Sequence, residues 1–91
     1  MNQQEEYRVM LVNSVLLASS KDEVKRFIDA AMQAMENQKI NKHIIARFIS
    51  KVLSDLAAFS PVEKNVQQWS NIKHAKILLN RIWIRLNSPN D

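Results

Sequence analysis

Two histidines, His43 and His74, are the residues of this chain best suited to proton transfer or metal binding. Neither belongs to a His-x-x-x-His or Glu-x-x-His pair, the spacings that place two ligands on one helix face. His74 also has Lys73 and Lys76 beside it, whose charges disfavour a bound cation. The chain has no cysteine, which excludes thiolate ligands and cysteine nucleophiles. We therefore predict no catalytic, cofactor-binding or metal-binding residue, and we expect that the protein is not an enzyme.

Basic residues are concentrated in the C-terminal part of the sequence. Residues 1–45 hold six Lys or Arg and six Asp or Glu, whereas residues 46–91 hold seven bases and three acids, so the net charge of +4 belongs to the second half. Lys73, Lys76, Arg81 and Arg85 are suited to contact phosphates, and a nearby tryptophan is suited to stack on a base. Nucleic-acid binding is therefore one hypothesis, although a solvated helix face is the simpler explanation of the charge.

Ile77 and Ile84 lie one heptad apart among polar and basic neighbours, on the side of the last predicted helix away from its main apolar stripe. Either this helix is covered on two sides by its own chain, or the second side meets another molecule. The segment 2–18 is apolar around most of its circumference, which allows the same two explanations. We predict an interface that combines Ile77 and Ile84 with Val9 and Leu16.

These observations favour a small, non-enzymatic helical protein that acts in protein–protein interaction or self-association. The expected partner is a second copy of the chain, as a homodimer, or another protein. The alternative is a nucleic-acid-binding accessory or regulatory protein that uses the basic C-terminal helix. The longest apolar stretch, residues 9–18, is about half a membrane span, so no membrane partner is expected. The absence of cysteine favours a reducing cytoplasm.

The elements that position these residues are predicted from the composition. The chain contains no glycine, the residue that hairpin turns, phosphate-binding loops and most helix C-caps require. Such a sequence favours an all-α fold. We predict a compact bundle of four helices with short connectors, in one domain over residues 1–91.

Helix starts are marked by caps. Ser20 with Glu23 is a capping box, Ser60 is followed by proline at the first helical position, and Asn41 is a third N-cap. The predicted helices span residues 2–18, 21–37 and 42–59, and the last begins at Pro61. Its two apolar stripes differ in phase, which predicts a kink or break near Ser70 between residues 61–69 and 71–86. Residues 86–91 are expected to be a frayed tail.

Core faces follow from helical spacing in the two middle helices. In the first of them the predicted inward residues are Val24, Phe27, Ile28, Ala31, Ala34 and Met35. In the second they are Ile45, Phe48, Ile49, Val52, Leu56 and Phe59.

Overall fold

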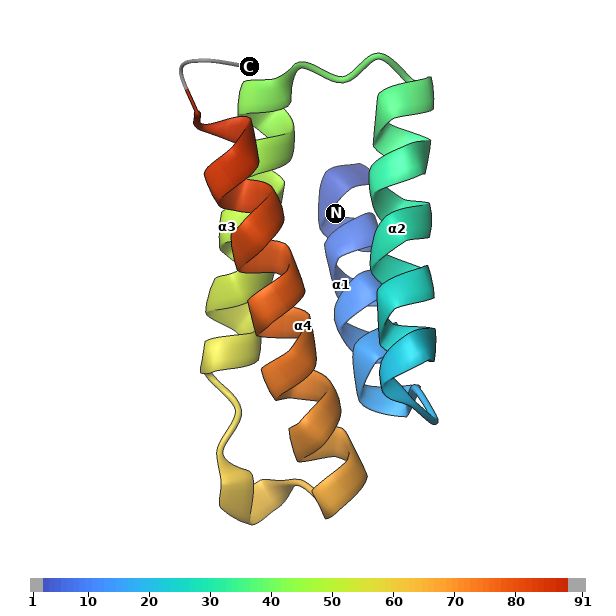
Figure 1. Ribbon diagram of the computed structural model, residues 1–91, viewed down its shortest axis with the longest axis vertical. Helices are drawn as coiled ribbons and strands as arrows, with labels where there is room; N and C mark the ends of the chain where they lie inside the picture. Colours follow the sequence, from blue (N-terminus) through green and yellow to red (C-terminus); the bar gives the residue numbers. More distant parts are fainter. Residues whose placement is uncertain (1–2, 89–91) are drawn as a thin grey trace.

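The computed structural model describes residues 3–88 of the chain. This range folds into four α-helices and one short 3-10 helix, without strands (Figure 1). The elements are α1 (Gln3–Leu17), α2 (Lys21–Asn37), α3 (Lys42–Ala57), η1 (Pro61–Glu63) and α4 (Val66–Leu86). The predicted all-α bundle of four helices is confirmed. The predicted start of the first helix at Asn2 and most of the predicted tail, residues 89–91, lie outside the described residues, while Leu86 belongs to α4.

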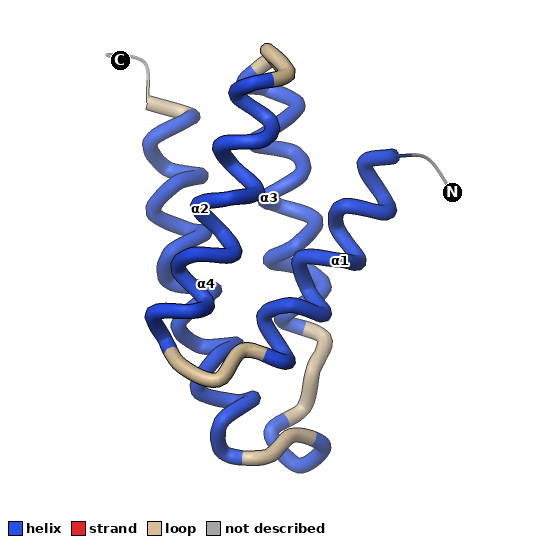
Figure 2. Tube along the Cα trace, turned by 90° about the vertical axis from the view of Figure 1, so that its right-hand side faces the viewer, coloured by secondary structure: helices blue, strands red, loops and turns tan. Residues whose placement is uncertain are grey.

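The four helices are not equivalent in their packing. Helices α1 and α4 each pack against the other three, whereas α2 and α3 barely touch. Figure 2 shows α4 and the N-terminal half of α1 on opposite sides of the molecule, with α2 and α3 between them. The C-terminal end of α1 approaches α4, and its N-terminal end diverges from it. The outer surfaces of α1 and α4 therefore face in different directions.

The predicted N-caps of α2 and α3 are present, but the predicted capping box of α2 is incomplete, because Glu23 bonds to the amide of Ser19 and not to that of the cap Ser20. The Ser20 hydroxyl accepts a hydrogen bond from the Glu23 amide at 3.1 Å, and the Glu23 carboxylate accepts one from the Ser19 amide at 2.9 Å. The Asn41 side chain accepts a hydrogen bond from the His43 amide at 2.7 Å. These side chains satisfy amide groups that have no partner within the first turn of a helix.

Helix α2 ends in a Schellman motif although the chain has no glycine. The Ile40 amide donates to the Met35 carbonyl and the Lys39 amide donates to the Glu36 carbonyl, which is the hydrogen-bond pair of this motif. Lys39 takes the position that glycine usually occupies, with φ of 57°, and is the one non-glycine residue with positive φ among residues 3–88. Ile40 then packs against the core. The absence of glycine has therefore changed the residue in the cap without removing the cap.

The predicted break near Ser70 is wrong. Helix α4 continues without interruption from Val66 to Leu86, and the break lies earlier, at Lys64 and Asn65. Asn65 and Gln68 form a reciprocal capping box, with the Gln68 amide 2.8 Å from Asn65 Oδ1 and the Asn65 amide 3.3 Å from Gln68 Oε1. The predicted Ser60 cap is present, but its hydroxyl accepts from the Val62 amide and starts η1 rather than α4.

Asn71, which follows the predicted break, connects α4 to α1. It is fully buried in the middle of the bundle. Its Nδ2 donates to the carbonyls of Val15 and Ala18, at 3.0 and 2.8 Å, and its Oδ1 accepts from Gln67 at 2.9 Å. The end of α1 is thus capped by a side chain from α4.

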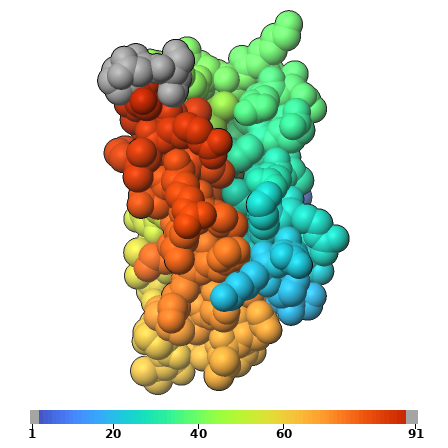
Figure 3. All heavy atoms as spheres, viewed as in Figure 1, coloured from blue at the N-terminus to red at the C-terminus, as the bar shows by residue number. Residues whose placement is uncertain are grey.

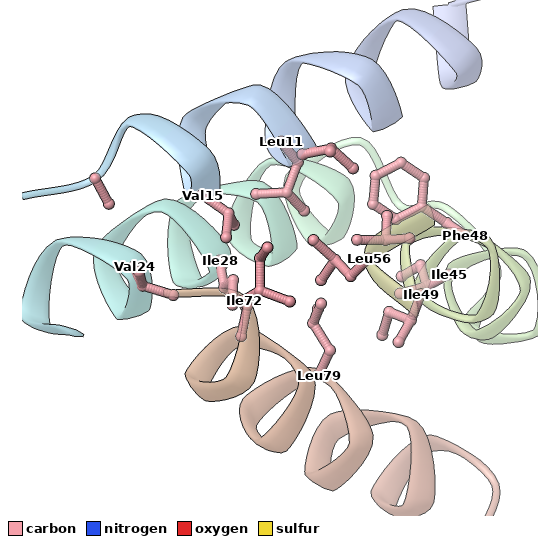
Figure 4. Packing of buried hydrophobic residues seen from close by; sticks show 14 of the residues in the cluster. Leu11, Val15, Val24, Ile28, Ile45, Phe48, Ile49, Leu56, Ile72 and Leu79 are labelled. Carbon is pink, nitrogen blue, oxygen red and sulfur yellow. The ribbon is translucent and has the colours of Figure 1, made fainter. Parts of the chain in front are cut away.

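One hydrophobic core joins the four α-helices. Figure 4 shows side chains from all of them converging, among them Val15 of α1, Ile28 of α2, Leu56 of α3 and Leu79 of α4. The predicted stripe of α3 is confirmed, because its members are buried or, in Phe59, partly buried against the core. The predicted stripe of α2 is confirmed except at Ala34, which is exposed. Helix α3 ends two residues before its predicted end at Phe59.

Candidate functional site

The two isoleucines that the sequence singled out lie on the outer side of α4. Ile77 is 50% exposed and Ile84 is 57% exposed. Neither side chain is therefore buried by another part of the described chain. Burial of this side of the helix within its own chain was one of the two explanations of the pattern. Helix α4 forms the left part of the front of the molecule in Figure 3, in orange and red, beside α2 in teal and green. The two side chains mark an apolar stripe on that helix.

The structure does not bring the four predicted interface residues onto one surface. Val9 is 42% exposed on α1, and Leu16 is partly buried and packs against the core. The N-terminal half of α1, which contains Val9, lies on the opposite side of the molecule from α4, which contains the two isoleucines (Figure 2). The exposed apolar residues of α1 that lie one heptad apart are instead Met10 and Leu17, which are 62% and 80% exposed.

The four basic residues of α4 spread around the outer half of the helix. Lys73, Arg81 and Arg85 are exposed, and Lys76 is partly buried. Lys76 and Arg85 are nine residues apart, which places them on opposite sides of the axis at about 100° per residue. Only Lys73 and Arg81 flank the isoleucines. The bases therefore do not form one band, although α4 contains no acidic residue that would neutralise them.

A shallow groove opens beside this stripe, where the beginning of α2 approaches α4. Its volume is about 290 Å³. The groove combines cationic groups with apolar ones and contains no carboxylate. The residues that matter here are Lys21 from α2 and Val66, Trp69, Lys73, His74 and Ile77 from α4. The sequence analysis missed this site because it depends on the contact between two helices that are distant in the sequence.

A larger groove, about 610 Å³, lies between the C-terminal half of α2, the beginning of α3 and the end of α4. Met32, Ile45 and Ile82 line it together with Asp29 and Arg85. Asp29 is already paired with Lys25 at 2.6 Å. The groove exists because α2 and α3 barely touch, which leaves the core open at this end.

The histidines are placed apart. His43 is exposed at the start of α3, and His74 lines the groove beside α4. No group of three or more His, Cys, Asp or Glu in residues 3–88 is arranged to hold a metal ion. Within the same range, no helix has the length and apolar character needed to cross a membrane.

Comparison with known proteins adds no functional information. No family model matches the chain, and no curated protein and no solved structure is significantly similar to it. The functional argument therefore depends on the surface of the molecule alone.

Proposed function

We propose that this protein is a non-enzymatic helical module that acts by protein–protein interaction, in the cytoplasm, and that the outer side of α4 is its contact surface. The partner is a second copy of the chain or another protein. The observation that carries the proposal is the exposure of Ile77 and Ile84, one heptad apart on a helix whose other side is fixed in the core. Exposed apolar side chains arranged in this way are typical of a helix that packs against another helix.

The packing of α4 supports the same proposal. It packs against all three other α-helices and is held by Asn71 to the end of α1. A partner that binds its outer side therefore meets a preformed surface, and binding does not carry the cost of ordering a loop. The absence of cysteine is the support for a reducing compartment.

The test is the double substitution Ile77→Lys with Ile84→Lys, followed by sedimentation velocity over a range of protein concentrations. Both side chains are half exposed, so we expect the variant to keep the far-ultraviolet circular dichroism of the parent. If the parent is a dimer, we expect the variant to be a folded monomer. A variant that unfolds instead would place the isoleucines in the core and remove the support for this surface.

The matched control is Met10→Lys with Leu17→Lys, an exposed apolar pair with the same spacing on α1. We expect this variant to associate like the parent. Loss of the dimer in the control alone would assign self-association to α1 and not to α4.

Nucleic-acid binding is the second candidate, and the observation in its favour is the run of bases on α4 without an acid. Such binding weakens steeply as the salt concentration rises. A gel-shift assay with DNA and RNA oligonucleotides at low salt and at about 0.15 M salt separates the two functions. Micromolar binding at the higher salt, reduced by Lys73→Gln, Lys76→Gln and Arg81→Gln together, would favour the second candidate.

A further inference from the structure

Five exposed residues of α4 share one side of the helix. At about 100° per residue they fall within an arc of about 80°. They are Val66, Lys73, Ile77, Arg81 and Ile84, and we call them the α4 face. Apolar and basic side chains alternate along this face. A partner must therefore present apolar side chains and compatible charges at the same spacing.

The charge of the α4 face is not neutralised within the described chain. Helix α4 has no acidic residue, and Lys21, Lys73 and Arg81 form no ion pair within residues 3–88. Two of the four acids of α2 are already engaged, because Asp29 pairs with Lys25 and Glu23 accepts from the Ser19 amide. The surface therefore has unpaired positive charge around an apolar centre.

We infer that the α4 face binds an acidic amphipathic helix of a different protein, an inference that rests on the proposed function. One apolar side chain of the partner occupies the groove beside Ile77, and another packs on Ile84 one heptad along. Carboxylates on both sides of that stripe meet Lys21 and Lys73 at one end and Arg81 at the other. The distance from Val66 to Ile84 is about 27 Å at 1.5 Å per residue, so the partner helix has about 18 residues.

The charges favour this occupant over a second copy of the chain. In an antiparallel two-fold dimer centred on Ile77 the same patch meets itself, so Lys73 of one copy would lie against Arg81 of the other. Opposed like charges weaken such a contact and select a partner of opposite charge. The phosphates of a nucleic acid would pair with the basic side chains of the α4 face. They would also lie against Ile77 and Ile84, where burial of these apolar side chains gives no favourable free energy. An acidic helix satisfies both kinds of group.

The experiment uses three synthetic peptides of about 18 residues with one leucine stripe, whose flanking positions are Glu, Gln or Lys. Each is titrated with the full chain at about 0.15 M salt and followed by fluorescence anisotropy. We expect the Glu peptide to bind at least about tenfold more tightly than the Gln peptide, and the Lys peptide not to bind. We expect Lys73→Gln with Arg81→Gln to abolish the preference for Glu.

A second pair of variants tests the apolar part of the surface without a change of charge. Ile77→Ser with Ile84→Ser should weaken binding of the Glu peptide about tenfold or more. The control, Met10→Ser with Leu17→Ser, removes a more exposed apolar pair with the same spacing from α1 and should leave the affinity unchanged.

Several outcomes overturn the inference. Equal affinity for the Glu and Gln peptides, or tighter binding of an RNA oligonucleotide or of vesicles of anionic phospholipid, would show that the acidic helix is not the occupant. If no peptide binds but the chain dimerises through Ile77 and Ile84, the inference fails and the proposed function stands. If no peptide binds and the chain does not associate, both fail.

Discussion

At the scale of single residues, Asn71 is the polar group on which the position of α1 depends. Its amide nitrogen donates to the carbonyls of Val15 and Ala18, which lie at the end of α1 and have no glycine cap. We predict that Asn71→Ala lowers the free energy of unfolding by about 2–4 kcal/mol, because both carbonyls lose a donor in a buried site. Chemical denaturation followed by circular dichroism measures this loss.

Two further variants separate hydrogen bonding from packing at this position. Asn71→Asp keeps the size of the side chain but replaces the donor with a carboxylate near two carbonyl oxygens, so we expect a loss at neutral pH at least as large as that of Asn71→Ala. Gln67→Ala removes only the bond to Asn71 Oδ1 and should cost about 1 kcal/mol or less. A loss below about 1 kcal/mol for both Asn71 variants would contradict the role assigned to its amide.

At the scale of elements, the end of α2 carries a conformational cost that a single substitution removes. Lys39 has positive φ, which is unfavourable for any residue with a Cβ atom. We predict that Lys39→Gly raises the free energy of unfolding by about 0.5–1 kcal/mol, since relief of this strain exceeds the added entropy of the unfolded chain. The neighbouring Gln38→Gly, at φ of −84°, should lower it by a similar amount. The same sign for both would contradict the prediction.

Helix starts were more predictable than helix ends and breaks. Ser20 and Asn41 cap α2 and α3 as predicted because an N-cap depends on a few adjacent residues. The break was predicted near Ser70 because the apolar stripes before and after this residue were both assumed to face the core. A straight helix cannot turn two stripes of different phase toward one core. In the structure Val66 is exposed, so that part of the stripe before Ser70 does not face the core, and Asn71 instead makes a buried polar contact with α1. That contact joins residues more than fifty positions apart and leaves no local signal.

At the scale of the whole molecule, the sequence predicted some of the exposed residues, but it did not predict how the faces of the helices are arranged around the core. The second stripe of α4 is exposed at Ile77 and Ile84, whereas Val9 belongs to a different side of the bundle. Periodicity fixes the angle of a residue around its own helix and contains no information about how the helices are arranged around the core. The groove beside α4, which needs Lys21 next to Lys73, was beyond sequence reasoning for the same reason.

The shared core also predicts how the molecule unfolds. Leu79 is fully buried among side chains from all four α-helices, so Leu79→Ala should lower the free energy of unfolding by about 2–5 kcal/mol. Because the four α-helices share one core, we expect the parent and the variant each to unfold in one transition. Circular dichroism reports on all helices, whereas Trp69 and Trp83 fluorescence reports on α4 alone. Denaturation curves from the two probes should coincide, and a separate fluorescence transition would divide the chain into independent units.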